Sequence, residues 1–381
     1  MSCLRDSPPP QAVETAVPPV RPARSDAAGT FLTRKGITMR TMHRHLLGAL
    51  ALAALALAGT GRAQAVEITV YTALEADQLK SYKAAFEKAH PEVTIRWVRD
   101  STGIITAKLL AEKSNPQADV VMGLAATSLM LLEKENLLQA YAPQGLEKVT
   151  ATMRDPAEPP KWVGMDVWAS ALCFNTVEGE RKKLPVPTSW ADLTDPVYKG
   201  QVAMPNPASS GTGFLMVSAW LQMMGEEKGW AFMDALHKNI AAYTHSGSKP
   251  CRQAGAGEYA IGLSFEYRAN KTKKDGAPIA VVLPKEGLGW DMEATAIMAT
   301  TKQPEAAKAL ADWAVTADAN KLYAENYAIV ALPGIASPLE YVEGDISKML
   351  IKNDFAWAAA NRDRILAEWS KRYDSKSEPK S

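Results

Sequence analysis

Strand and helix patterns alternate along the chain after residue 65, and this order constrains the fold most. Residues 67–71 alternate polar and apolar side chains as a strand does, and residues 76–89 carry apolar side chains at helical spacing. Two more strand patterns, at residues 93–98 and 118–123, each lead into an apolar-faced helical pattern. A repeated strand–helix order predicts a parallel sheet covered by helices, so we expect an α/β fold.

The rest of the chain continues this alternation with longer strands. Residues 167–175 form an apolar strand pattern, and residues 294–299 form another. A helix is predicted from residue 304 to about 316, and an amphipathic helix over residues 346–373. Residues 66–381 are numerous enough to bury a sizeable core, and their length favours two lobes.

Residues 42–65 carry the three parts of a secretory signal. A short basic stretch precedes an apolar run, and Ala63-Gln64-Ala65 forms a small-x-small cleavage site. The apolar run is too short to span a bilayer, so cleavage there releases an exported protein. Residues 58–61 lack the Cys that a bacterial lipoprotein carries, so we expect no membrane anchor. Residues 1–41 show no apolar periodicity, and we interpret them as a non-native extension, from a start site placed too early, or as a disordered one.

Composition excludes some partners and leaves one covalent question open. Lys and Arg number 43 against 42 Asp and Glu, and no basic block follows the signal, so we expect no nucleic-acid partner. Two cysteines remain after cleavage, Cys173 and Cys251, and the sequence does not decide whether they pair. They are too few for a metal framework, and the remaining histidines are widely spaced, so we expect no metal and no cofactor.

Four segments carry a resemblance to a known family. They are Val70-Tyr71-Thr72-Ala73, Ser101-Thr102-Gly103, Gln117-Ala118-Asp119-Val120 and Pro187-Thr188-Ser189-Trp190-Ala191-Asp192-Leu193. With these motifs the chain resembles the type II periplasmic binding proteins of ABC importers, in the branch that binds ferric ion, thiamine, polyamines and phosphonates. Within that branch it is similar to 2-aminoethylphosphonate-binding proteins.

The resemblance implies an architecture and a role. It implies a two-lobed α/β fold with the ligand in the cleft between lobes, where residues 66–170 and 296–381 form lobe 1 and residues 171–295 form lobe 2. It also implies a monomeric periplasmic protein, without enzymatic activity, that captures 2-aminoethylphosphonate and delivers it to the permease subunits of an ABC importer.

One segment predicts an anion site from its residues alone. Ser209, Ser210, Gly211 and Thr212 stand between a strand and a helix, where hydroxyls and free N–H groups at a helix start can hold an anion. The alternative is that a serine there only caps the helix. Two further loop-to-helix junctions offer similar groups at the same sheet edge, where ligands of parallel sheets bind. Their residues are Tyr71, Thr72 and Ala73 in one, and Ser101 and Thr102 in the other.

A second group of residues could hold the cationic end of a zwitterion. Carboxylates beside aromatic rings suit an ammonium group, through ion pairing and cation–π contact. The candidates are Glu266, Tyr267, Trp290, Asp291 and Trp168; Asp166 lies beside Trp168 at the expected first crossover, and Glu75 lies near the start of the first predicted helix. The alternative for each is an ordinary exposed carboxylate or a core aromatic.

Other ligands and an enzyme remain as alternatives. The ferric relatives place two adjacent tyrosines where this chain has Glu266-Tyr267, and a His where Leu74 stands, which argues against ferric ion. A polyamine or thiamine-type ligand stays open. No Gly-x-Ser-x-Gly elbow or zinc-type His motif is present, although a Cys–His pair or a carboxylate pair formed in space is left open.

Overall fold

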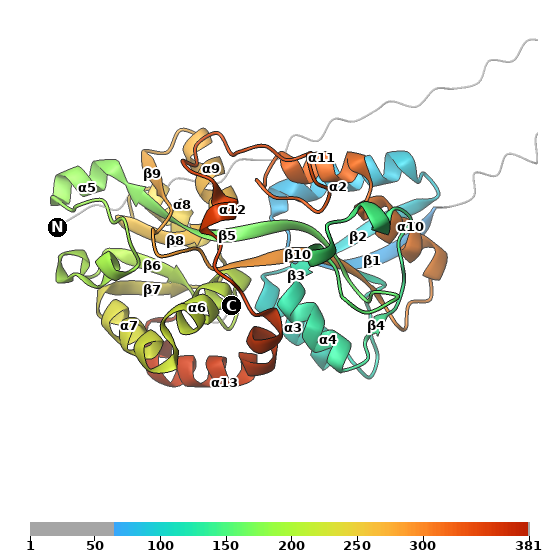
Figure 1. Ribbon diagram of the computed structural model, residues 1–381, viewed down its shortest axis with the longest axis horizontal. Coiled ribbons are helices and arrows are strands. Elements are labelled where there is room, and N and C mark those ends of the chain that lie inside the picture. Colours follow the sequence, from blue (N-terminus) through green and yellow to red (C-terminus); the bar gives the residue numbers. More distant parts are fainter. Residues whose placement is uncertain (1–64, 380–381) are drawn as a thin grey trace, which may run out of the picture. The chain divides into compact units, whose positions relative to one another are not determined.

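The computed structural model describes residues 65–379, in which strands and helices alternate along most of the chain (Figure 1). The expected extension and nearly all of the signal lie outside the described residues. The strands are β1 Val66–Thr72, β2 Val93–Arg99, β3 Val120–Ala125, β4 Leu138–Gln139, β5 Val163–Asn175, β6 Val202–Pro205, β7 Ile240–Thr244, β8 Ile261–Phe265, β9 Ile279–Val282 and β10 Trp290–Met298.

Helices connect most of these strands. They are α2 Ala76–Ala89, α3 Thr102–Ala111, α4 Ala126–Lys134, α5 Thr176–Lys182, α6 Gly211–Met224, α7 Glu226–Asn239, α8 Lys249–Gly255, α9 Glu266–Lys274, α10 Pro304–Ala314, α11 Ala317–Ala324, α12 Ile346–Met349 and α13 Phe355–Tyr373, with short 3₁₀ turns between them. The predicted α/β class is therefore confirmed.

The strands pair in the order β2-β1-β3-β10-β5-β8-β6-β7, with β4 beside β10 and β9 beside β5. β1 runs parallel to β2 and β3, and β6 runs parallel to β7 and β8, as strand–helix repeats require. β10 and β5 are antiparallel to their neighbours. We call β1–β4 with β10 the first half-sheet, and β6–β9 the second.

β5 joins the two half-sheets. Its first residues, Val163 to Ala169, pair with β10, and its last, Ser170 to Asn175, pair with β8 and β9. Figure 1 shows this long strand passing from one half-sheet into the other. All of its residues are buried, which explains why the sequence shows a nearly continuous apolar run there.

The C-terminal part differs from the single helix predicted over residues 346–373. α12 ends at Met349, and α13 begins only at Phe355, so the prediction of one continuous helix was wrong. The reason is local, because the Asp354 side chain accepts a hydrogen bond from the Trp357 N–H at 2.8 Å and caps a new helix. α13 then packs its aromatic face, including Trp369, into the core of the second half-sheet.

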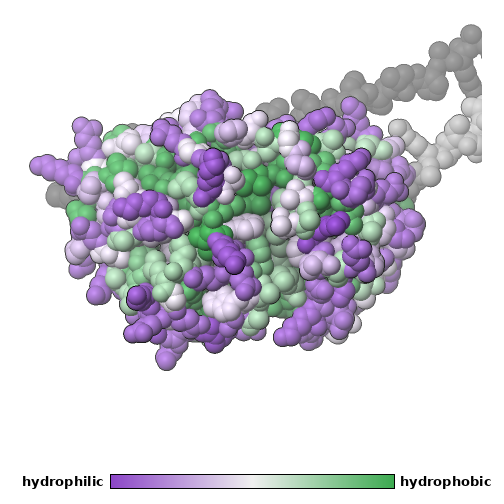
Figure 2. Space-filling view, in the orientation of Figure 1, coloured by the Kyte–Doolittle hydropathy of each residue, from purple (hydrophilic) through white to green (hydrophobic). Residues whose placement is uncertain are grey.

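The segment before α13 covers the middle of the face seen in Figure 1. Leu339, Val342 and Ile346 pack on Leu288 and on Ala169 of β5. Figure 2 shows apolar side chains gathered near the middle of this face and hydrophilic ones around its edge. The joining strand is thus shielded from water on this side. Among the described residues, no helix is long and apolar enough to cross a membrane.

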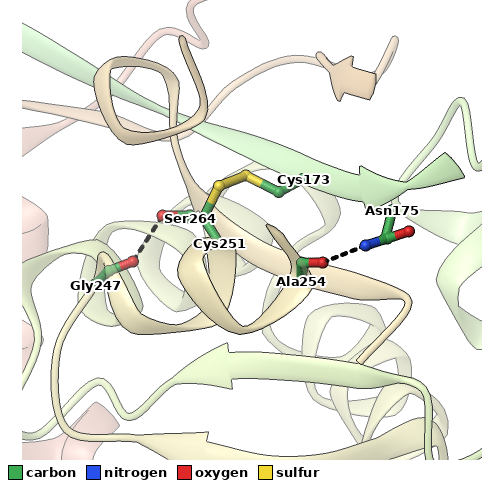
Figure 3. The surroundings of a disulfide bond; sticks show 6 residues. All are labelled: Cys173, Asn175, Gly247, Cys251, Ala254 and Ser264. Carbon is green, nitrogen blue, oxygen red and sulfur yellow. Dashed lines mark hydrogen bonds between the residues drawn. A yellow bond between two sulfur atoms is a disulfide. The ribbon is translucent and has the colours of Figure 1, made fainter. Parts of the chain in front are cut away.

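The structure answers the question about the cysteines. Cys173 of β5 and Cys251 of α8 form a disulfide, with their Cα atoms 5.3 Å apart (Figure 3). Both are fully buried, in a small apolar cluster with Ala171, Ala254 and Ile279. The bond therefore fixes α8 against the joining strand.

Candidate functional site

A small polar pocket is lined by residues from both half-sheets and from the strands that join them. The lining residues are Ala73, Glu75, Arg99, Ser101, Thr102, Trp168, Ser210, Gly211, Thr212, Ser246, Gly247, Phe265 and Glu293. Most of these offer a hydroxyl, a guanidinium or a helix-start N–H. The lining is therefore rich in groups that can donate a hydrogen bond.

Two helix starts meet at this pocket. α3 begins after Ser101 in the first half-sheet, and α6 begins after Ser210 in the second. They approach closely, since the Gly103 N–H donates to the Ser209 carbonyl at 2.8 Å. A Cβ at Gly211 would lie 2.6 Å from the Thr102 hydroxyl, so only glycine fits there. The positive ends of two helix dipoles thus converge on one small space.

The hydroxyls at the two helix starts differ in what they already do. Ser210 caps α6, accepting a hydrogen bond from the Gly213 N–H at 3.3 Å. Ser101 stands at the corresponding position of α3 and makes no such bond. Thr212 is the second residue of α6, in its first turn, and does not cap the helix. Ser101 and Thr212 therefore keep their hydroxyls for another partner, whereas Ser210 serves the helix as well.

The loop at residues 246–247 closes the same side of the pocket. A Cβ at Gly247 would clash with the Thr212 side chain, which shows how near this loop lies to α6. The Ser264 hydroxyl donates to the Gly247 carbonyl at 2.7 Å and holds the loop in place (Figure 3). α8, which follows this loop, carries Cys251 of the disulfide. The covalent link thus supports an element next to the pocket.

Charged groups at the first half-sheet side are mutually compensated. Glu75 accepts from Arg268 at 2.6 Å and from Arg252 at 3.1 Å, and both arginines belong to the second half-sheet side. Arg99 lies 3.8 Å from Glu75, and its Nε donates to the Leu74 carbonyl. The Glu75 carboxylate is therefore already neutralised, while Arg99 leaves positive charge near the helix starts.

The joining strands supply the acidic and aromatic part of the lining. Glu293 of β10 faces the pocket near Trp168 of β5 and Phe265, the last residue of β8. Asp166 lies directly opposite Glu293 on β5 and is fully buried. Burial and the neighbouring carboxylate raise the pKa of Asp166, and burial is the largest cause of the raised pKa of Glu293.

The pocket brings together half of the residues that the sequence singled out. These are Ala73, Ser101, Thr102, Trp168, Ser210, Gly211 and Thr212. All but Trp168 come from the three loop-to-helix junctions. The assignment of these residues to ligand contacts remains a prediction, and their convergence supports it.

Three predicted residues of those junctions lie outside the pocket lining. The Tyr71 hydroxyl donates to Glu112 at 2.9 Å on the other side of β1. The Thr72 hydroxyl accepts from the Leu74 N–H and is fully buried. The Ser209 hydroxyl donates to the His245 carbonyl at 2.7 Å. Each of these three side chains is therefore hydrogen-bonded to another group of the protein, although the Ser209 carbonyl still connects the two helix starts.

Of the predicted acidic and aromatic residues, Trp168 lines the pocket and the other four lie outside the lining. The Glu266 carboxylate accepts from the Ala169 N–H at 2.7 Å, and burial raises its pKa to about 8. Asp291 accepts from the Thr127 hydroxyl at 2.6 Å, and burial raises its pKa to about 7. Tyr267 is buried against Phe265 and Tyr327, and the Trp290 Nε1–H donates to the Ile351 carbonyl. Their place is taken by Glu75, Glu293 and Phe265.

Five lining residues were not named from the sequence. They are Arg99, Ser246, Gly247, Phe265 and Glu293, whereas Glu75 was named among the acidic residues. Arg99 and Phe265 end strands that lead into the pocket, and this position at the carboxyl edge of the sheet was a usable signal. Glu293 is a charged residue inside an apolar strand, which was the other available signal.

Known proteins give this pocket a context. Residues 115–362 match the family described as "Bacterial extracellular solute-binding protein". A "Probable ABC transporter periplasmic-binding protein" of Sinorhizobium fredii is 28% identical, over 73% of this chain and 78% of that protein. An "Fe(3+)-binding periplasmic protein" of Serratia marcescens is 25% identical, over 71% and 80%. The structure of AfuA from Actinobacillus pleuropneumoniae with fructose-6-phosphate bound is 26% identical, with a TM-score of 0.75, over 81% of this chain and 98% of AfuA.

Proposed function

The chain belongs to the bacterial extracellular solute-binding proteins, and we propose that its pocket captures 2-aminoethylphosphonate for an ABC importer. The protein is a solute-binding protein and not an enzyme. The periplasmic relative from Sinorhizobium supports the importer, and the signal pattern at residues 42–65 supports export. The permease subunits of that importer are the expected macromolecular partners.

The meeting of the α3 and α6 helix starts is the observation that carries the proposal. A phosphonate has three oxygens and a negative charge, and both are matched by N–H groups and hydroxyls converging from two sides. Ser101 and Thr212 provide hydroxyls, and Arg99 provides a compensating positive charge at the same side of the pocket. Such donors replace the water that a buried oxyanion loses.

The other side of the pocket suits the amino group. Glu293 presents a carboxylate, and Trp168 and Phe265 present aromatic rings from neighbouring strands. An ammonium group is stabilised by both kinds of partner. A short zwitterion, with its anion at the helix starts and its cation at Glu293, fits this distribution of charge.

A sugar phosphate is a second candidate, favoured by one observation. AfuA, 26% identical and of the same fold, is solved with fructose-6-phosphate bound. Its phosphate could use the same helix starts, and carboxylates accept hydrogen bonds from sugar hydroxyls as well as from ammonium. Ferric ion prefers anionic oxygen ligands such as phenolate and carboxylate, whereas the lining that the described residues form holds no Tyr, and one of its two carboxylates, Glu75, is already paired with arginines. Within residues 65–379 there is no group of three or more His, Cys, Asp or Glu side chains that could hold a metal ion.

Calorimetric titration of the purified protein tests the proposal. The ligands are 2-aminoethylphosphonate, fructose 6-phosphate, inorganic phosphate, putrescine and ferric citrate. We expect 2-aminoethylphosphonate to bind tightly and phosphate to bind more weakly, because phosphate has no ammonium group to pair with Glu293. Ethylphosphonate and ethanolamine, which each carry half of the ligand, serve as matched controls. Tight binding of fructose 6-phosphate alone would establish the second candidate, and binding of putrescine or ferric ion alone would overturn both.

A further inference from the structure

Asp166 and Glu293 form a facing pair of buried carboxyls with unsatisfied oxygens. They lie directly opposite each other on antiparallel β5 and β10, and they are 0% and 9% exposed. Both carboxyl oxygens of Asp166, and Oε2 of Glu293, have no hydrogen-bond partner among residues 65–379. Two ionised carboxylates only accept hydrogen bonds and repel each other. One proton held between them gives the pair a hydrogen bond and removes the repulsion.

We propose that Glu293 determines specificity for the cationic end of the ligand, and that Asp166 is the positioning residue behind it, the two carboxyls sharing one proton. This inference rests on the proposed function, because the anion of the ligand must first be held at the helix starts. It deepens that function by assigning the choice between an ammonium and a neutral end group to this pair.

The surroundings of the pair leave its one negative charge without a protein cation, so that charge is available to a cationic ligand. Within the described chain, neither Asp166 nor Glu293 makes an ion pair with a Lys, Arg or His side chain. The titratable groups that face the pair are the acids and phenols Glu75, Glu266, Tyr82, Tyr323 and Tyr327, while Arg99 lines the same pocket and lies 3.8 Å from Glu75. A buried charge without a partner is unfavourable. A ligand ammonium group therefore stabilises the pair more than a ligand hydroxyl does.

Glu75 cannot take this role, although it lines the same pocket. Its carboxylate is paired with Arg252 and Arg268, and it lies near Arg99. A ligand cation would compete there with three guanidinium groups. The unpaired carboxylate of Glu293 is thus the acidic group of the pocket with attraction left for an ammonium.

The shared proton predicts a pH dependence with a definite sign. Burial raises the pKa of both carboxyls, so Glu293 gains a proton at a higher pH than an exposed Glu does. Once both are protonated, the pair is neutral and loses its preference for a cation. The preference for an ammonium ligand should therefore fall as the pH is lowered, while binding of a hydroxyl analogue should change less.

Two ligands of nearly the same shape test this inference. 2-Aminoethylphosphonate and 2-hydroxyethylphosphonate differ only in the ammonium or hydroxyl group. We expect the wild-type protein to prefer the amino ligand, and Glu293→Gln to reduce that preference about tenfold to hundredfold while hydroxyethylphosphonate binding is retained. Asp166→Asn places an N–H donor beside Glu293, which favours the ionised carboxylate. This variant should therefore retain the preference for the amino ligand and lose it only at a lower pH than the wild type does. Glu340→Gln, at an exposed carboxylate, is the matched control.

The outcomes separate this inference from the proposed function. Equal affinity of the wild-type protein for the two ligands at every pH would overturn the inference and leave the phosphonate site standing. An equal loss of both ligands in Glu293→Gln would also overturn it, since the residue would then not discriminate. Binding of neither phosphonate would overturn the proposed function and the inference together. The wild-type pH profile needs no variant, so the test does not depend on the folding of either substitution.

Discussion

Replacing Thr212 by Val should separate ligand binding from helix stability. Thr212 lines the pocket in the first turn of α6 but does not cap the helix, because that position belongs to Ser210. Val keeps the branched shape of Thr and removes only the hydroxyl. If that hydroxyl donates to a phosphonate oxygen, its loss affects the complex and leaves the free protein nearly unchanged.

The expected sizes follow from the two kinds of hydrogen bond. A bond to a charged group contributes about 1.5–3 kcal/mol, so Thr212→Val should weaken 2-aminoethylphosphonate binding roughly tenfold to hundredfold. The cap that Ser210 makes to the Gly213 N–H at 3.3 Å contributes about 1 kcal/mol to stability. Ser210→Ala should therefore lower both the affinity and the free energy of unfolding, whereas Thr212→Val should lower mainly the affinity.

Titration calorimetry and urea unfolding measure these two effects on the same samples. Thr316→Val is the matched control, since Thr316 caps α11 by accepting from the Ala319 N–H at 3.2 Å, away from the pocket. It should lose about 1 kcal/mol of stability and no affinity. The reasoning is refuted if Thr212→Val binds 2-aminoethylphosphonate as the wild type does, or if it loses as much stability as the control.

Three further predictions concern the framework of the site. Changing Cys173 and Cys251 to Ala together should lower the free energy of unfolding by about 4–5 kcal/mol, since the disulfide closes a loop across 78 positions; an unchanged denaturation midpoint would contradict this. Gly103→Ala should weaken ligand binding more than tenfold with little change in melting temperature, because the added Cβ would clash with the Ala208 carbonyl where the two helix starts meet. An unaltered affinity in calorimetry would contradict the close approach of the helix starts. Burial raises the pKa of Glu266 from 4.5 to about 8, so the folded state binds this proton more tightly than the unfolded state does. The free energy of unfolding should therefore fall as the pH rises between these values, by at most about 5 kcal/mol from this group. Glu266→Gln should flatten that part of the stability–pH curve, and an equal slope in the variant would exclude the effect.

The sequence predicted those parts of the site that depend on neighbouring residues. Ser101, Thr102 and the stretch from Ser210 to Thr212 each stand where a strand pattern gives way to a helix pattern. The hydroxyls and glycines at such a junction determine the local backbone, and the free N–H groups of a helix start follow from helix geometry. The structure places these residues at one pocket because parallel strands end at the same sheet edge.

The acidic side of the pocket could not be predicted in the same way. Glu266 and Glu293 both stand within or beside buried strands, and the sequence offers no reason to prefer one. Which carboxylate faces the pocket depends on pairings between distant segments, such as the bond from the Ala169 N–H that occupies Glu266. The antiparallel register of β10 on β5, which places Glu293 opposite Asp166, is likewise a contact between distant parts of the chain.

The position of Glu293 connects ligand recognition with the joining of the two half-sheets. The helix starts at Ser101 and Ser210 belong to different half-sheets, whereas Trp168 lies on β5, which joins them, and Glu293 lies on β10 beside β5. A phosphonate alone would contact the helix starts, but a zwitterion would contact β5 and β10 as well. Because the phosphonate contacts helix starts from both half-sheets, its binding energy would favour the close arrangement in which the Gly103 N–H donates to the Ser209 carbonyl. On this reasoning the phosphonate contributes to closure, and the amino group contributes to selectivity through Glu293.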